Sequence, residues 1–209
     1  MLKIGKFVLS SCATNCYFVY EEGRKEVIFF DPGDQGELIY EKLTQAGFSV
    51  AAIYLTHGHF DHMGGCNELR KLTGARVYAL EEEADICRDT QMNLSRAFGS
   101  AYTVEPDEYI HDGDLRTEGE ISFRVIATPG HTKGSCVFYF EEAGILIGGD
   151  TLFLESVGRT DFPTGSASAL VRSVKEKLFP LPDEVKVFSG HGESTTIGHE
   201  KKYNPFLQD

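Results

Sequence analysis

Short apolar runs recur along the whole chain and predict a protein that is built largely from β-strands. Most of these runs are rich in Val, Ile, Phe and Tyr, and Gly, Pro or Asp stands at many of their ends, as is typical of strands. We therefore expect strands at CYFVY (16–20), EVIFF (26–30), AAIYL (51–55), ARVYAL (75–80), ISFRVIAT (121–128), SCVFYF (135–140), GILIGG (144–149) and VKVFSG (185–190).

Apolar residues at three- and four-residue steps predict helices between these strands. This spacing occurs in residues 36–47 and 65–74, and each of these segments ends at a glycine. Residues 81–94 open with three glutamates, which favour a helix N-terminus. Residues 166–179 begin at a capping serine and end before Pro180.

The two halves of the chain repeat the order of strands and helices and meet near residues 105–120. Residues 97–118 show little periodicity and predict a loop or a hairpin. Because a sheet must bury its apolar face, this order predicts two sheets packed face to face, with helices outside. The chain of 209 residues has no linker, fixed-period repeat or low-complexity tract, so we expect residues 1–209 to form one domain.

Charge and cysteine content restrict the partners and the compartment. The net charge of −12 and the pI near 5.0 argue against nucleic acid or an anionic membrane as a partner, because phosphate binding requires a basic face. The five cysteines form no CxxC pair, which indicates reduced thiols. Gly5 and Lys6 interrupt the N-terminal apolar stretch, and no run reaches the ~18 apolar residues of a membrane span. We therefore expect a cytoplasmic protein, and nothing in the sequence specifies its oligomeric state.

The stretch THGHFDHMGG (56–65) carries the strongest chemical signal. His57, His59 and Asp61 occupy alternate positions, so on extended backbone their side chains share one face, whereas His62 lies on the other side. A helix would separate His57 from His59, which distinguishes this stretch from the helical HExxH zinc motif. Because clustered imidazoles and carboxylates have little structural use, the stretch predicts a loop that serves two metal ions.

Three further candidate ligands each follow a predicted strand. His131 comes after ISFRVIATPG, Asp150 after GILIGG and His191 after VKVFSG. Strand ends at one rim of a sandwich would bring these side chains to the histidine loop, and the small residues beside them permit sharp turns. His111 and His199 lie outside this pattern and are interpreted as ordinary hydrogen-bonded residues.

The candidates supply enough ligands for two ions. The predicted ligands are His57, His59 and His131 for one ion, Asp61, His62 and His191 for the other, and Asp150 as a bridge between them. Nitrogen and oxygen ligands without thiolate suit Zn²⁺, and also Fe or Mn. Neither set closes the coordination shell, and an open position is typical of a catalytic rather than a structural site.

Four motifs together resemble the metallo-β-lactamase superfamily, namely THGHFDH, TPGHTKGS, GGDTLF and SGHG. The resemblance extends from TNCYFV (14–19) to TTIGHEKKYNPFL (195–207), and GDTLF, VGRTDFP and the final segment resemble the short bacterial type of glyoxalase II-like hydrolase. It implies an α/β fold of the αββα four-layer sandwich type, with two mixed sheets, in a single metallo-β-lactamase-like domain over residues 1–209. It also implies a dinuclear site that is held by the seven ligands named above.

The resemblance further implies a thioester hydrolase, with S-D-lactoylglutathione as the leading small-molecule substrate and two divalent ions, Zn²⁺ first among them, as cofactors. Such ions would make water nucleophilic at neutral pH and stabilise the developing oxyanion. Asp61 would orient the attacking water as well as bind metal. A thiol, with a pKa of about 8.5, departs readily as thiolate. No dedicated acid for an amine leaving group is evident, which favours thioesters or other activated esters.

Three residues near the motifs have two interpretations each. The resemblance makes Asp31 a hydrogen-bond partner of a ligand histidine, whereas the sequence alone fits an Asp-Pro-Gly turn. Arg159 either binds substrate or forms an ion pair with Asp161. Lys133 stands where the family more often has proline, and it either contacts an anionic substrate or is a solvated loop residue.

Other functions compete with thioester hydrolysis. A persulfide dioxygenase shares the GDTLF…GRTDF stretch and holds one Fe²⁺ with two histidines and a carboxylate, here His57, His131 and Asp150. Another esterase or lactonase of the superfamily fits the same site. A non-catalytic metal-binding protein fits it less well, because structural zinc prefers closed, thiolate-rich shells.

Two departures from known members limit the expected substrates. A β-lactamase of the commonest class carries a cysteine where Asp150 stands, which argues against antibiotic hydrolysis. Classical glyoxalase II enzymes carry a C-terminal helical region that grips glutathione. We expect that region to be largely absent here, because the sequence ends soon after His191. Its absence argues against specificity for glutathione but not against hydrolysis of thioesters.

Overall fold

The computed structural model describes residues 1–208 and contains two large β-sheets. In spatial order, the N-terminal sheet consists of β1 (Leu2–Leu9), β2 (Thr14–Glu21), β3 (Glu26–Phe30), β4 (Ser49–Tyr54), β5 (Arg76–Leu80) and β6 (Glu108–Ile110). The first three strands pair antiparallel, and the strands from β3 to β6 pair in parallel. This sheet is therefore mixed.

The C-terminal sheet is also mixed. In spatial order, it consists of β14 (Thr195–Thr196), β13 (Lys186–Ser189), β10 (Ile145–Gly149), β9 (Cys136–Phe140), β8 (Ile121–Ala127) and β7 (Leu115–Glu118). Strands β10 and β13 pair in parallel, and the other neighbours pair antiparallel. A separate small hairpin joins β11 (Leu152–Phe153) to β12 (Ser156–Val157).

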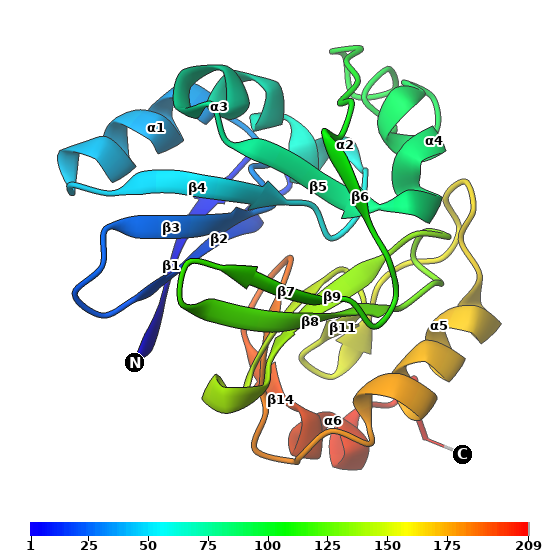
Figure 1. Cartoon of the computed structure of the whole chain (residues 1–209). Coiled ribbons are helices and arrows are strands. Elements are labelled where there is room, and N and C mark those ends of the chain that lie inside the picture. The colour runs from blue at the N-terminus through cyan, green and yellow to red at the C-terminus, as the bar shows by residue number, and fades with distance from the viewer. Residues whose placement is uncertain (209) are drawn as a thin grey trace.

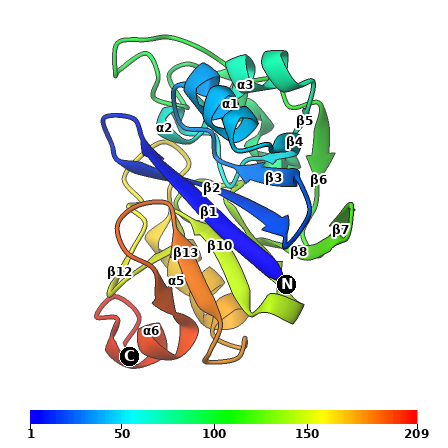
Figure 2. The ribbon, with the colours of Figure 1, turned by 90° about the vertical axis from the view of Figure 1, so that its left-hand side faces the viewer.

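Helices cover the outer faces of both sheets. Helices α1 (Gly36–Gln45) and α3 (Cys66–Thr73) lie on the N-terminal sheet, and α5 (Ala167–Ser173), the π-helical turn that continues it (Val174–Leu178) and α6 (Ile197–Tyr203) lie on the C-terminal sheet. Figures 1 and 2 show the resulting order of helices, sheet, sheet and helices. The predicted αββα sandwich is confirmed.

The remaining helical segments are short. They are α2 (Phe60–Met63), α4 (Ala84–Arg88) and the 3₁₀ turns Glu81–Glu83 and Glu141–Ala143. Within residues 1–208, no helix has the length and apolar content to cross a membrane.

Apolar clusters fill the three spaces between the layers. Between the sheets, Phe138 packs against Phe30, with ring centroids 5.0 Å apart, and edge-on against Tyr54 at 5.5 Å. Leu69 of α3 belongs to the cluster beneath the N-terminal helices, and Val174 belongs to the cluster beneath the C-terminal ones. The central aromatic cluster therefore fixes how one sheet lies on the other.

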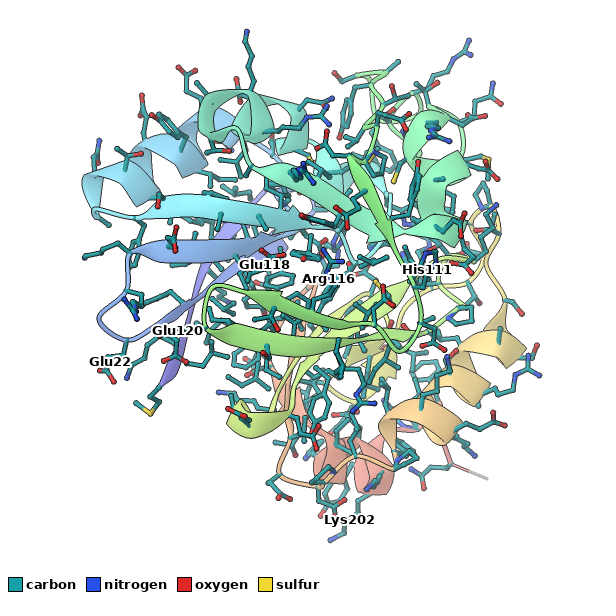
Figure 3. All side chains as sticks on the ribbon, in the orientation of Figure 1. Glu22, His111, Arg116, Glu118, Glu120 and Lys202 are labelled. Carbon is teal, nitrogen blue, oxygen red and sulfur yellow. The ribbon has the colours of Figure 1, made fainter. Side chains whose placement is uncertain are left out.

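Charged residues of β7 close one edge of this central cluster. The Tyr54 hydroxyl donates to Glu118 Oε1 at 2.6 Å, and the Arg116 guanidinium lies 5.0 Å from the centroid of the Tyr78 ring. Figure 3 shows Arg116 and Glu118 next to each other where the two sheets meet. The same view places His111 at the β6–β7 connection, where its exposed ring pairs with Glu81.

Two predicted segments differ in the structure. The helix expected over 81–94 ends at Arg88, because the Asp89 carboxylate accepts hydrogen bonds from the backbone N–H groups of Gln91 and Met92 and so turns the chain. The 97–118 segment contains β6, and its end forms β7, which pairs with β8 as a hairpin. Strand β1 and helix α6 were not predicted from the sequence.

Replacing Phe138 by Ala is expected to lower the free energy of unfolding by about 3 to 5 kcal/mol, because the fully buried ring would leave a cavity between the sheets. Urea unfolding at fixed metal concentration measures this loss. Leu115→Ala on β7 is the control, because its side chain is 73% exposed and its loss should change stability by about 0.5 kcal/mol or less. Equal effects of the two substitutions would contradict the assigned core.

Candidate metal centre

The seven predicted ligands lie in the segments that directly follow four strands of the two sheets. They are His57, His59, Asp61 and His62 after β4, His131 after β8, Asp150 after β10, and His191 after β13. The structure brings all seven to one edge of the sandwich. Their ligand atoms form three overlapping groups, and within each group the atoms lie within 4.8 Å of one another.

The loop after β4 changes conformation in its middle. His59 has extended backbone with φ −71° and ψ 150°, and helix α2 begins at the next residue. Asp61 and His62 therefore lie on a helical turn, in which the His62 N–H donates to the His59 carbonyl at 3.0 Å. The expectation that Asp61 continues the extended segment is wrong. The turn instead directs the adjacent side chains Asp61 and His62 to the same group.

Three imidazoles of the first group direct ring nitrogens at one another. Nε2 of His131 lies 2.8 Å from Nδ1 of His59 and 3.2 Å from Nε2 of His57. Burial lowers the pKa of His57 and His131 and lowers that of His59 to about 3. These three rings are therefore neutral at pH 7, which is the form that binds metals.

Oxygen atoms behind two of these rings determine which nitrogen carries the proton. Nδ1 of His131 donates to the carbonyl oxygen of Arg159 at 2.7 Å. The Thr56 hydroxyl donates to Asp31, so it accepts from Nδ1 of His57 at 3.1 Å. Nε2 therefore carries a lone pair in both rings, and the two lone pairs face each other at 3.2 Å. A shared cation would turn this repulsion into coordination, so the geometry fits a metal ion.

The second group combines imidazoles with carboxylates. Nε2 of His191 lies 3.3 Å from both Nε2 of His62 and Oδ2 of Asp61. Asp150 lies between the groups, with Oδ2 3.4 Å from Nε2 of His191 and 3.7 Å from Nε2 of His131. Oδ1 of Asp150 is buried and makes no hydrogen bond. Nε2 of His62 lies 3.3 Å from this oxygen, and a divalent cation would satisfy a buried carboxylate oxygen that makes no hydrogen bond.

The carboxylates shift the pKa of the second group upward. Burial alone would lower the pKa of His62 and His191, but Asp150 and Asp61 outweigh it and raise the pKa of His191 to about 9 and that of His62 well above its usual value. Burial would likewise raise the pKa of Asp150, but His62 holds it well below its usual range. A metal ion competes with the protons on these imidazoles, so metal binding weakens as the pH falls.

Asp31 fixes the orientation of His62. Its Oδ2 accepts from Nδ1 of His62 at 2.9 Å and from the Thr56 hydroxyl at 2.7 Å, and its Oδ1 accepts from the Thr56 N–H at 2.7 Å. Asp31 itself adopts a left-handed backbone with φ 51°, which is unfavourable for a residue with a side chain. The aspartate therefore turns Nε2 of His62 toward the ligand group.

Glu83 connects the two histidine loops, and it was not predicted from the sequence. Its Oε1 accepts from the Gly58 N–H at 2.8 Å, between His57 and His59. Its Oε2 accepts from the Thr132 hydroxyl at 2.9 Å, next to His131. The sequence offered no signal for this role, because Glu83 is the last of three consecutive glutamates and only tertiary contacts distinguish it.

Strand β2 holds the loop of His191. The side-chain amide of Asn15 donates to the carbonyl oxygens of Ser189 at 2.9 Å and Gly192 at 3.0 Å. The neighbouring Thr14 hydroxyl donates to Oδ2 of Asp61 at 3.0 Å. Two adjacent polar residues on a buried strand were the available signal for these contacts.

The two predicted substrate contacts lie in different environments. Nζ of Lys133 pairs with Asp85 at 2.7 Å, and Lys133 does not line the cavity beside the ligands. Arg159 lines that cavity, forms two 2.7 Å hydrogen bonds with Asp161, and places its guanidinium 3.9 Å from the centroid of the Phe162 ring. Of the two predicted substrate contacts, Arg159 therefore lies at the cavity and Lys133 does not.

A cavity of about 300 Å³ opens onto the ligand groups. The candidate ligands His59, Asp61, His131, Asp150 and His191 form its base. The rest of the lining is mostly apolar and consists of Cys12, Phe60, Leu94, Phe98, Phe153, Phe162 and the Arg159 side chain. The fold and this site together define a metal-binding protein whose cavity admits a small molecule to the ligand groups.

The chain belongs to the metallo-beta-lactamase superfamily, whose family model matches residues 10–191. Hydroxyacylglutathione hydrolase GloC of Haemophilus influenzae is 33% identical over 199 residues, which cover 92% of each chain. The probable metallo-hydrolase YqgX of Bacillus subtilis is 36% identical over 195 residues, again 92% of each chain. Metal-dependent hydrolysis is therefore the general activity that these relatives suggest.

Solved structures extend the comparison to the whole fold. The crystal structure of BLEG-1, described as a B3 metallo-beta-lactamase, is 36% identical with a TM-score of 0.94 and covers 99% of this chain and 100% of its own. TTHA1623, in a di-iron-bound form, is 35% identical with a TM-score of 0.86 and covers 97% of this chain and 100% of its own. The second structure shows that two metal ions are bound within a closely similar fold.

Replacing Asp31 by Asn is expected to weaken metal binding about 10- to 100-fold, because His62 loses its charged acceptor. Competition with a chromophoric chelator measures the affinity. Asp34→Asn is the matched control, because Oδ1 of Asp34 accepts from the neighbouring Gln35 N–H at 2.8 Å rather than from a ligand histidine. Unchanged metal affinity in the Asp31 variant would show that the hydrogen bond from His62 to Asp31 does not contribute to metal binding.

The stability contribution of Glu83 is expected to depend on pH. Burial raises the pKa of Glu83 to about 7 from an ordinary value of 4.5. Its contribution is therefore complete below pH 4.5 and is lost as the pH rises through 7. Relative to the Glu83→Gln variant, the wild type should lose on the order of 3 kcal/mol of unfolding free energy as the pH rises from 4.5 to 7.

Urea unfolding in chelator over this pH range measures the effect of Glu83, and the exposed neighbour provides the control. Glu82→Gln should give a curve that stays parallel to that of the wild type, because Glu82 is exposed. A Glu83→Gln curve that is also parallel would show that Glu83 has the same pKa in the folded and unfolded chains.

Proposed function

We propose that this protein is a dinuclear metal-dependent hydrolase of thioesters, of the hydroxyacylglutathione hydrolase type, with S-D-lactoylglutathione as the first substrate to test. The single observation that carries the proposal is the second ligand group, Asp61, His62 and His191, which lies beside the three-histidine group with Asp150 between them. The identity to GloC, which is named a hydroxyacylglutathione hydrolase, supports the choice of substrate.

The proposed ligands are assigned by the two groups. His57, His59 and His131 would hold one ion, Asp61, His62 and His191 the other, and Asp150 would contact both. This nitrogen and oxygen set suits Zn²⁺, and also Fe or Mn. When bound by these residues, two such ions would supply the chemistry of making water nucleophilic at neutral pH and polarising a carbonyl group.

The protein's own groups set the geometry around the reacting carbon. The Thr14 hydroxyl donates to Oδ2 of Asp61, which fixes the carboxylate at the base of the cavity. Burial would raise the pKa of Asp61, but His62 outweighs it and lowers the pKa, so Asp61 stays ionised and can accept a hydrogen bond from the attacking water. Asp61 is therefore the proposed catalytic carboxylate.

The acids in the cavity favour a leaving group that needs no proton. Among the described residues that line the cavity, the carboxyl groups are Asp61 and Asp150, and the pKa of each is lowered by neighbouring histidines against the effect of burial. Neither carboxyl group carries a proton at pH 7. A thiolate, whose conjugate acid has a pKa of about 8.5, departs without one, whereas an amine requires a donor. His191 also lines the cavity and its pKa is raised to about 9, but it would lose its Nε2 proton on binding a metal ion, so the metal-loaded site supports thioester rather than amide hydrolysis.

Metal-free protein is expected to be inactive, and addition of two equivalents of Zn²⁺ is expected to restore hydrolysis of S-D-lactoylglutathione. The released thiol is measured with a disulfide reagent, and elemental analysis gives the ions per chain. Nitrocefin and a simple lactone, supplied to the same preparation, test for β-lactamase and lactonase activity. Their hydrolysis without that of the thioester would replace the proposal, and the likeness to BLEG-1 makes the nitrocefin assay necessary.

A mononuclear iron dioxygenase is the second candidate function. The di-iron form of TTHA1623 supports iron as a metal for this fold, although its two ions agree with a dinuclear site. Such an enzyme would hold one Fe²⁺ through His57, His131 and Asp150. It would consume O₂ with a persulfide such as glutathione persulfide, whereas a hydrolase consumes none.

Replacing His191 by Ala separates the two candidates. If two ions are required, the variant should lose at least about 100-fold in thioester hydrolysis and bind one ion fewer, because His191 belongs to the second group only. His199→Ala is the control, because this histidine pairs with Glu155 at 3.1 Å, away from the ligands. Full activity of His191→Ala with one iron per chain and O₂ uptake would favour the dioxygenase.

A further inference from the structure

The cavity has an apolar wall that starts at the metal-ligand turn, and we infer that this wall selects the acyl group of the substrate. It consists of Phe60, Leu94 and Phe98 and is called the apolar wall below. The favoured substrates would be thioesters whose acyl group carries an aromatic or extended apolar substituent, in place of the methyl group of lactate. This inference rests on the proposed thioester hydrolase function.

Two stacked rings form the largest part of the apolar wall. Phe60 and Phe98 have ring centroids 4.3 Å apart and an interplanar angle of 17°. Phe98 is nevertheless 57% exposed, so one face of the stack remains available. A substrate group that covers this face gains free energy from the water it displaces.

The loop that carries Leu94 and Phe98 is fastened to the turn that carries the ligands. The Phe60 N–H donates to the Asn93 carbonyl at 2.8 Å, and the Phe60 carbonyl accepts from the Tyr102 hydroxyl. The side-chain amide of Asn93 in turn donates to the Tyr102 carbonyl at 2.9 Å. In Figure 1 this loop connects α4 to β6 beside α2. The apolar wall is therefore positioned before substrate binds, which lowers the entropic cost of binding.

Leu94 occupies the apolar wall in an unfavourable conformation. Its φ is 68°, in the left-handed region that side chains with a Cβ rarely adopt. Glycine would satisfy this turn without strain, so a leucine here indicates that the side chain is needed where it lies. That place is the lining of the cavity.

Phe60 lies between the ligands His59 and Asp61, so the apolar wall begins at the point where the scissile carbonyl must lie. Of the two groups on that carbonyl, the acyl substituent is short and stays near it. The thiol part of glutathione is longer and carries carboxylates, which lose hydration without compensation against an apolar surface. The acyl substituent is therefore assigned to the apolar wall.

A pair of substrates that differ in one group tests this assignment. S-D-mandeloylglutathione carries a phenyl group where S-D-lactoylglutathione carries a methyl group. Wild-type protein should show a kcat/KM at least about tenfold higher for the mandeloyl thioester, and Phe98→Ala should reduce this ratio about tenfold. Phe206→Ala is the matched control, because Phe206 is 56% exposed and does not line the cavity, and its ratio should equal that of the wild type.

Binding of two stable thioethers separates failure of this inference from failure of the proposed function. S-phenacylglutathione and S-acetonylglutathione also differ by phenyl against methyl and cannot be hydrolysed. Calorimetry should show that the wild type prefers the phenacyl compound and that Phe98→Ala loses the preference. If neither thioester is hydrolysed, the proposed function is wrong, and this binding pair still decides whether the apolar wall is selective.

Two outcomes would overturn the inference. One is equal binding and equal turnover of both members of each pair by the wild type. The other concerns the thiol part of the substrate. In this outcome, Phe98→Ala changes the ratio of kcat/KM between the lactoyl thioesters of glutathione and benzyl mercaptan, but it leaves the mandeloyl-to-lactoyl ratio of kcat/KM unchanged. That result would assign the apolar wall to the thiol part of the substrate.

Discussion

Facing lone pairs on buried, neutral imidazoles are the constraint on which the site depends. The Arg159 carbonyl and the Thr56 hydroxyl hold protons on the outer nitrogens of His131 and His57, so their inner nitrogens meet without a hydrogen between them. Burial prevents either ring from relieving the contact by taking up a proton at neutral pH. A cation relieves it, and the free energy of metal binding is thereby linked to the stability of the folded loops.

The junction between the two sheets is what brings these groups together. The ligand loops of the C-terminal sheet are held by residues from the N-terminal half, since Glu83 binds Thr132 and Asn15 binds the backbone on both sides of His191. At Gly190, a Cβ atom would lie 2.2 Å from Oδ1 of Asp150, so no other residue fits beside the ligands. The central aromatic cluster sets the distance between the sheets, and it therefore also sets the distances between ligands from different sheets.

Local signals in the sequence were enough to predict the inner strands and the convergence of the candidate ligands. Apolar runs predicted those strands, and candidate ligands directly after such runs could be placed at one rim of a sandwich from their positions in the chain. Strand β1 was missed because it is an edge strand in which Lys3, Gly5 and Lys6 interrupt the apolar pattern. Glu83 was missed because its role arises from a tertiary contact that the three-glutamate run does not reveal. The helical turn at Asp61 was missed because four residues are too few to show helical periodicity.

The segment after Arg88 shows how a local departure from the predicted helix affects function. A helix that continued to residue 94, as its sequence suggested, would not have provided the left-handed turn at Leu94 or the backbone contacts of Asn93 with Phe60. The carboxylate of Asp89 ends the helix early and releases the chain to line the cavity. Because both backbone groups of Phe60 are bound by this loop, a shift of the loop would also move the flanking ligands His59 and Asp61. Phe60 therefore couples substrate selection to the geometry of the metal site. A substitution in this loop can change substrate specificity without changing metal binding only if the hydrogen bonds to Phe60 remain intact.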